Sequence, residues 1–225
     1  MSGATPQDEV AVVLVGHGAP ATDCPPQLVG ELMQLEWRAG AHASADGSTT
    51  GAAREGSGVP QAPAGHSGPP ASASERYTRM RELDATIRSW PRHAGNDPYK
   101  VGLEQVAATL RPLLPVGRLV IGYGEFCQPS IEEAVAGVIR DGARRVLVIP
   151  SMLTPGGLHS EHDIPRALAC LRTAHPEISI EYLWPFDLHA IATLLASPIH
   201  RALGGVLPSR TPSCGVRATS THRSS

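Results

Sequence analysis

Two histidines and a glutamate each stand just beyond an apolar run of the chain. His17 lies between two glycines, Glu125 lies in a short polar segment, and His159 follows a pair of glycines. The runs that precede them are Val10–Val15, Leu119–Ile121 and Val146–Ile149. Continuous apolar runs are typical of strands buried in a parallel sheet, and ligands bind in the crevice beyond the carboxyl ends of such strands. We therefore expect the three side chains to surround one crevice.

Imidazole and carboxylate groups either bind metal or transfer protons. Two imidazoles with one carboxylate suit a borderline divalent ion such as Co²⁺, Ni²⁺ or Fe²⁺. Taken alone, His17 is equally typical of a turn, His159 of a helix cap, and Glu125 of a solvated strand end. Their expected convergence favours a metal site in which both histidines also move protons.

Further side chains are expected around His159. A helix is predicted to start at Asp163, and its positive end would favour the neutral imidazole that metal binding requires. We place His162 and Asp163 just outside the metal ligands.

Several other chemistries lack their sequence motifs. The chain contains no G-x-x-x-x-G-K-[ST] loop, no G-x-G-x-x-G after a strand and no G-x-S-x-G elbow. Glycine rather than arginine precedes His17, which argues against phosphohistidine enzymes. The four cysteines form no C-x-x-C pair, and Cys127, near Glu125, is either a site neighbour or, as we favour, a packing residue.

Composition predicts a globular chain with an aliphatic core. Hydrophobic residues make up 41% of the 225 residues but aromatic residues only 4%, and the net charge is −2. This charge gives no reason to expect nucleic acid or a membrane surface as partner. Since we find neither a signal segment nor a run of about 20 apolar residues, we expect a cytoplasmic protein.

Strands and helices alternate along the chain, which predicts an α/β fold: an open, parallel, four-stranded sheet with helices on both faces. The expected strands are Val10–Val15, Leu119–Tyr123, Arg145–Ile149 and Ile178–Leu183. The expected helices cover about 27–38, 75–90, 98–114, 130–142, 163–174 and 187–203.

Low-complexity segments flank and interrupt this pattern. Residues 39–74 are dominated by Ala, Gly, Ser, Pro and Thr, so we predict a disordered, dispensable insertion within a domain of residues 9–203. Residues 1–8 are expected to be an N-terminal extension and 204–225 a disordered tail.

Three segments together resemble the sirohydrochlorin cobaltochelatase and ferrochelatase family. They are Val-Gly-His-Gly-Ala-Pro (15–20), Glu-Phe-Cys-Gln-Pro-Ser-Ile-Glu-Glu-Ala (125–134) and Thr-Pro-Gly-Gly-Leu-His-Ser-Glu-His-Asp-Ile-Pro (154–165). The resemblance implies a chelatase-like fold and a lyase that inserts Co²⁺, Fe²⁺ or Ni²⁺ into sirohydrochlorin without ATP, for cobalamin or sirohaem. It also implies that His17 and His159 are the metal- and proton-handling histidines, with Glu125 as the acidic metal ligand. No cofactor besides the metal substrate is expected.

The resemblance covers one chelatase-like unit, which implies the short form that self-associates, here as a homodimer. We expect the carboxylates of the tetrapyrrole to be held by arginines, namely Arg88, Arg92 and Arg166. The alternative function is a non-catalytic carrier of metal or tetrapyrrole with the same fold.

Overall fold

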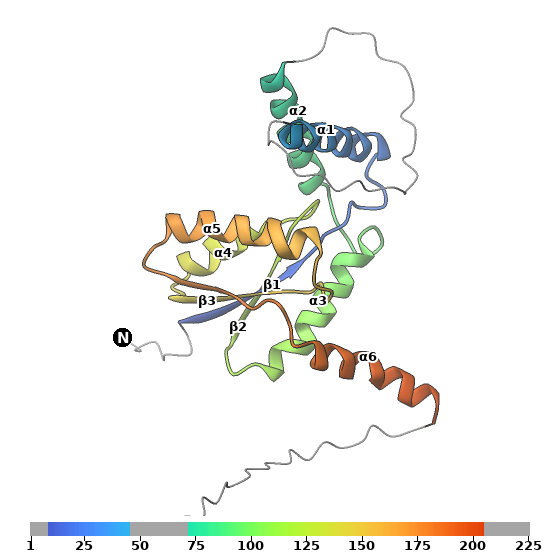
Figure 1. Cartoon of the computed structure of the whole chain (residues 1–225), viewed down its shortest axis with the longest axis vertical. Coiled ribbons are helices and arrows are strands. Elements are labelled where there is room, and N and C mark those ends of the chain that lie inside the picture. The colour runs from blue at the N-terminus through green and yellow to red at the C-terminus, as the bar shows by residue number, and fades with distance from the viewer. Residues whose placement is uncertain (1–8, 46–71, 205–225) are drawn as a thin grey trace, which may run out of the picture. The chain divides into compact units, whose positions relative to one another are not determined.

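Four parallel strands form the centre of the fold. The computed structural model describes residues 9–45 and 72–204. The strands are β1 (Val10–Gly16), β2 (Arg118–Tyr123), β3 (Arg145–Pro150) and β4 (Ser179–Tyr182), in the order β2-β1-β3-β4 (Figure 1). The predicted open, parallel α/β sheet is confirmed.

The register of the strands brings their carboxyl ends to one edge. Gly16 at the end of β1 pairs with Tyr123 at the end of β2, and Val15 pairs with Pro150 at the end of β3. The chain therefore leaves three adjacent strands at nearly the same level, so the residues that follow them can meet.

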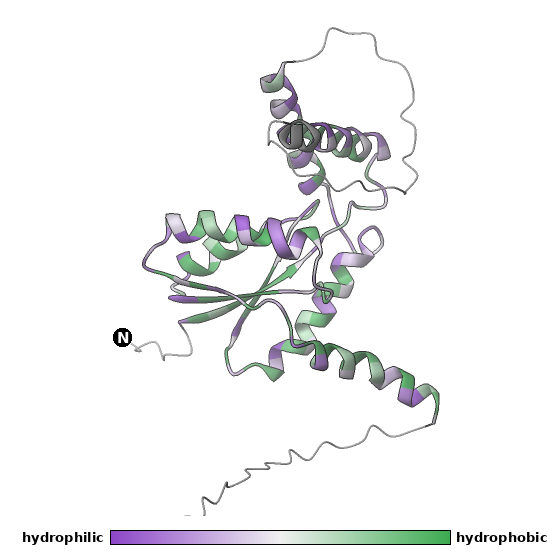
Figure 2. Ribbon diagram, viewed as in Figure 1, coloured by the Kyte–Doolittle hydropathy of each residue, from purple (hydrophilic) through white to green (hydrophobic). Residues whose placement is uncertain are grey.

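Helices cover both faces of the sheet, as predicted. Helices α4 (Ile131–Arg140) and α5 (Ile164–Ala174) lie side by side on one face, where their aliphatic residues join those of the strands in the largest core cluster (Figure 1). On the opposite face, α3 (Pro98–Leu110) and the 3₁₀ turn Arg111–Leu113 follow the capping residue Asp97. Figure 2 shows the strands mostly in the hydrophobic colour, as expected for a sheet buried on both sides.

A helical hairpin packs beside the loop that follows β2. It consists of α1 (Pro26–Ala45) and α2 (Ala73–Arg88). Its core contains Leu32, Leu83 and Ile87, and it includes Phe126 of that loop. Since Phe126 is the neighbour of Glu125, the hairpin helps to fix the position of this carboxylate.

The structure corrects the ends of these two helices. α1 continues to Ala45 rather than ending near Arg38, and α2 begins at Ala73, where Ser72 and Glu75 form a capping box. Four alanines within 39–45 explain the longer helix, because alanine has the highest helix propensity even where little apolar surface can be buried. The rest of the predicted insertion, 46–71, lies outside the described residues, as do 1–8 and 205–225.

The described residues after Trp184, 185–204, belong to a second unit of the chain. Its described part contains α6 (Leu188–Ala202), which Asp187 caps through the backbone N–H of His189, close to the predicted helix. In residues 9–45 and 72–204, no helix combines the length and apolarity that a membrane span needs.

Candidate metal centre

The ladder between β1 and β2 continues past the strands and brings His17 beside Glu125. Gly124 N–H donates to Gly16 O at 2.9 Å, and Glu125 N–H donates to His17 O at 2.8 Å. Gly18 makes this approach possible: its φ is +93°, and a Cβ atom there would lie 1.9 Å from Glu125 O. Only glycine fits such a position without displacing the loop that follows β2 and carries Glu125.

Tyr99 of α3 supports the first histidine from the opposite face of the sheet. Its hydroxyl accepts a hydrogen bond from His17 N–H at 2.7 Å. The sequence analysis did not find this contact, because 82 residues separate the two partners.

His159 begins a π-helical turn rather than lying in a loop. This turn, η2, spans His159–Asp163, and Ile164 N–H donates to His159 O, five residues earlier. The following helix, α5, starts next to Asp163 as predicted, but the Asp163 side chain makes no capping bond to it. Instead, the Asp163 carboxylate lies 2.9 Å from His159 Nδ1.

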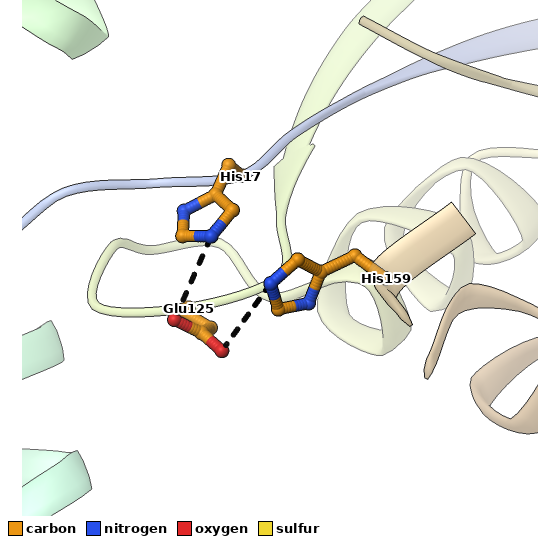
Figure 3. A group of neighbouring side chains, drawn as sticks. All are labelled: His17, Glu125 and His159. Atoms are coloured by element: carbon orange, nitrogen blue, oxygen red, sulfur yellow. Dashed lines mark ion pairs between the residues drawn. The ribbon is translucent and has the colours of Figure 1, made fainter. Parts of the chain in front are cut away.

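The three predicted groups meet at the carboxyl edge of the sheet (Figure 3). His17 Nε2 lies 3.9 Å from Glu125 Oε2, and His159 Nε2 lies 3.9 Å from Glu125 Oε1. The imidazole rings are nearly perpendicular, at 88°, with their centroids 4.4 Å apart. The side chains keep 40% (His17), 38% (Glu125) and 27% (His159) of their surface exposed, so the centre is open to an incoming ligand.

The second nitrogen of each ring has its own oxygen partner. His17 Nδ1 lies 2.8 Å from Gly18 O, in addition to the contact of His159 Nδ1 with Asp163. A carbonyl or carboxylate oxygen at Nδ1 favours the tautomer with the proton on Nδ1. Both histidines therefore present an Nε2 lone pair toward Glu125.

This donor set fits a divalent transition metal. One ligand atom from each residue lies within 4.8 Å of the others. Imidazole nitrogens bind first-row ions at about 2.0–2.1 Å, so two donors of one ion are at most about 4.2 Å apart. A closure of less than about 1 Å would bring the three groups to bonding distance, and the mixed N/O set suits Co²⁺, Ni²⁺ or Fe²⁺.

The other predicted site residues separate into three cases. Asp163 lies against His159, where it was expected, and its functional role stays a prediction. His162 is exposed and is not part of the described group of candidate metal ligands. Arg166 is exposed on α5 and stays a prediction for substrate binding.

Arg88 and Arg92, which the sequence analysis expects to hold substrate carboxylates, both have guanidinium groups engaged inside the protein. Arg88 pairs with Asp84 and donates to Cys127 O and Gly124 O. Arg92 is buried with Asp97 and donates to Ala19 O and Phe126 O. Cys127 is fully buried among core residues, which agrees with its favoured packing role.

Glu36 is a residue near the site that the sequence analysis missed. It lies one turn after the buried Leu32 of α1. Desolvation raises the pKa of Glu36, and the negative charges of Glu125 and Asp84 raise it further against the opposing effect of Arg88. Its i+4 spacing from Leu32 was the available signal that Glu36, which is exposed, lies on the same side of α1 as that buried residue.

Fold and site together define an α/β protein with a candidate divalent-metal centre at the carboxyl edge of its sheet. Comparison with known proteins agrees with this class: residues 96–201 match the model of the CbiX family. The sirohydrochlorin cobaltochelatase of Methanocaldococcus jannaschii is 40% identical over 65 residues, which are 29% of this chain and 43% of that protein. The sirohydrochlorin ferrochelatase of Priestia megaterium is 31% identical over 92 residues, 40% of this chain and 34% of that protein. Over residues 96–201 the chain is therefore similar to the CbiX family.

The matched regions are partial. The alignments with the cobaltochelatases of M. jannaschii, Methanopyrus kandleri and Methanococcus maripaludis cover 43%, 53% and 33% of those proteins. Among solved structures, the sirohydrochlorin chelatase SirB from Bacillus subtilis subspecies spizizenii in complex with cobalt is 16% identical. Its TM-score is 0.40, with 87% of this chain and 50% of SirB covered.

Proposed function

We propose that this protein inserts Co²⁺, Fe²⁺ or Ni²⁺ into sirohydrochlorin without ATP, as a step toward cobalamin or sirohaem. The observation that carries the proposal is the convergence of the His17 and His159 Nε2 atoms on the two oxygens of Glu125. The names of the similar cobaltochelatases and ferrochelatases support the same reaction.

In the proposed reaction, the metal ion is a substrate held by His17, His159 and Glu125. Insertion replaces two pyrrole N–H protons of the macrocycle with M²⁺, so two protons must leave the ring for each ion that enters. A histidine that releases the ion regains a free Nε2 lone pair and can accept one of these protons. The exposed faces of the three side chains leave room for the macrocycle to approach the held ion.

Residues around the centre set the orientation of the ligands before the substrates arrive. Asp163 and the carbonyl of Gly18 hold the Nδ1 atoms, and Tyr99 holds the backbone of His17. A ligand held in its reactive orientation avoids part of the entropic cost of bringing ion and ring together.

For the assembly, we propose a homodimer, because a four-stranded unit of this size gains buried surface by self-association. Sirohydrochlorin carries carboxylates, and the exposed guanidinium of Arg166 on α5 is our candidate for binding one of them.

The test is the rate of sirohydrochlorin metallation, followed by absorption under anaerobic conditions with Co²⁺, Ni²⁺ or Fe²⁺. We expect His17→Ala and His159→Ala each to lower kcat/KM by about 100- to 10,000-fold, the range for loss of a positioned proton-transfer group. Their Tm should stay close to wild type, because both side chains are partly exposed. His162→Ala, a change of an exposed histidine in the same turn, is the matched control and should retain most activity.

Two outcomes would contradict the proposal. The absence of any acceleration over the uncatalysed reaction with all three ions would reject the chelatase. Stoichiometric binding of metal or tetrapyrrole without repeated turnover would indicate the carrier instead.

A further inference from the structure

The turn that carries His159 has an unusual backbone. A π-helical turn is rare and occurs mostly as a single widened turn, because its hydrogen bonds span five residues rather than four. Here Ile164 N–H bonds to His159 O, and the next residue, Pro165, has no N–H to donate. The carbonyl groups in the middle of the turn therefore receive no hydrogen bond from the proline that follows.

Strand β4 supplies a donor to this part of the turn. The Tyr182 hydroxyl donates to Ser160 O at 3.0 Å, and Ser160 is itself buried. Tyr182 is paired with Val148 of β3, and the next residue, Leu183, donates its N–H to Val148 O. Burial, with the negative charge of Glu161, raises the pKa of Tyr182 to about 12, so the phenol keeps its proton and remains a donor near neutral pH.

A second connection starts from the side chain of Glu161, the residue in the middle of the turn. Its Oε1 accepts the N–H of Gly156 at 3.0 Å and the indole N–H of Trp184 at 3.2 Å. Gly156 lies in the segment that leads into His159, and Trp184 follows β4. These hydrogen bonds lower the pKa of Glu161, as expected for an ionised acceptor.

We infer that Tyr182 and Glu161 are positioning residues that hold the π-turn so that His159 Nε2 points at Glu125 and His17. Tyr182 supports the backbone of the turn at Ser160, and Glu161 links the segment before the turn to the chain after β4. The inference rests on the proposed function insofar as it assigns these residues a part in metal binding. Neither residue contacts the ligand atoms, so both act through His159.

The experiment measures Co²⁺ binding to the full-length protein without tetrapyrrole, by titration of the visible absorption bands of the bound ion. The variants are Tyr182→Phe, Glu161→Ala and Glu161→Gln, with Glu181→Gln as the control. Glu181 lies on the same strand as Tyr182 and pairs with Arg145 on the surface, away from the turn. A second readout is the ¹⁵N–¹H spectrum of the histidine rings in metal-free protein, which reports the tautomer of His159.

We expect Tyr182→Phe and Glu161→Ala each to raise the Kd for Co²⁺ by about tenfold, as is typical when residues supporting a ligand are lost. Glu161→Gln keeps an oxygen acceptor, so this variant should bind Co²⁺ nearly as well as wild type. If only the negative charge of Glu161 mattered, Glu161→Gln would be impaired as well. In the ring spectra, the Nδ1–H tautomer of His159 should give way to a mixture in the two impaired variants.

The inference is overturned if Tyr182→Phe and Glu161→Ala match Glu181→Gln in Kd and leave the His159 signals unchanged. These results are separable from the chelatase proposal. A wild-type protein that binds Co²⁺ but does not metallate sirohydrochlorin would reject the enzyme and leave the positioning role intact. If the wild type does not bind Co²⁺, the ring spectra alone decide.

Discussion

The substitution Arg92→Ala should lower the stability of the fold rather than the affinity of the protein for its substrate. The Arg92 side chain is 9% exposed and its partner Asp97 only 2%, with Nη1 and Oδ2 2.5 Å apart. The same guanidinium donates to Ala19 O at 2.7 Å and to Phe126 O at 2.5 Å. Arg92 therefore joins the loops that follow His17 and Glu125.

The expected loss follows from the burial of this pair. Removing one partner of a buried ion pair typically costs about 3–5 kcal/mol, because the remaining charge is left without compensation. Each kcal/mol lowers Tm by about 2–4 °C in a domain of 150–250 residues, so Tm should fall by about 10 °C. The double change Arg92→Met/Asp97→Asn should recover part of this stability, since it removes both charges and keeps a side-chain oxygen to cap α3 at Lys100 N–H.

The assay is urea unfolding followed by circular dichroism, together with KM for the tetrapyrrole under conditions where each variant is folded. Arg166→Ala is the control, because Arg166 is exposed on α5 and should leave stability within about 0.5 kcal/mol of wild type. If Arg92→Ala unfolded within about 1 kcal/mol of wild type and raised KM for the tetrapyrrole, the structural account of Arg92 would be refuted.

Two further substitutions test the surroundings of Glu125. Gly18→Ala should sharply weaken Co²⁺ binding, because the new Cβ atom would lie 1.9 Å from Glu125 O. The control is Gly142→Ala, at a φ of +97° with no atom within 4 Å, which should cost only about 1–2 kcal/mol of stability and leave Co²⁺ binding intact. Equal Co²⁺ affinity in the two variants would contradict this prediction. Glu36→Gln should raise KM for the metal at low salt with little change in kcat, because a carboxylate near Glu125 attracts the incoming cation; an unchanged KM at low salt would exclude that role.

The sheet and the three central residues could be predicted because their signals are local. Val10–Val15 is continuously apolar, and the structure buries all of it except the partly exposed Val10. The parallel arrangement then brings the residues after β1, β2 and β3 to one edge, so His17, Glu125 and His159 meet although 142 residues separate the two histidines. Strand periodicity and topology together were sufficient for this inference.

The backbone around His159 could not be predicted in the same way. Asp163 before Ile164 and Pro165 has the composition of a helix start, and an aspartate there usually caps the helix. In the structure its carboxylate is used by His159 instead, inside a widened turn supported by Tyr182. The hydrogen bond from Tyr182 to this turn comes from another strand, so a local sequence pattern does not contain it.

The arginines show the same limit more strongly. An arginine near a predicted site has the right chemistry for substrate carboxylates, and nothing in its immediate neighbours separates that role from an internal one. Arg92 is internal because its partners come from three places: Asp97 nearby, Ala19 after β1, and Phe126 after β2. Its guanidinium donates hydrogen bonds to these two loop carbonyls. The charge is therefore used to hold together the loops that carry the candidate metal ligands His17 and Glu125.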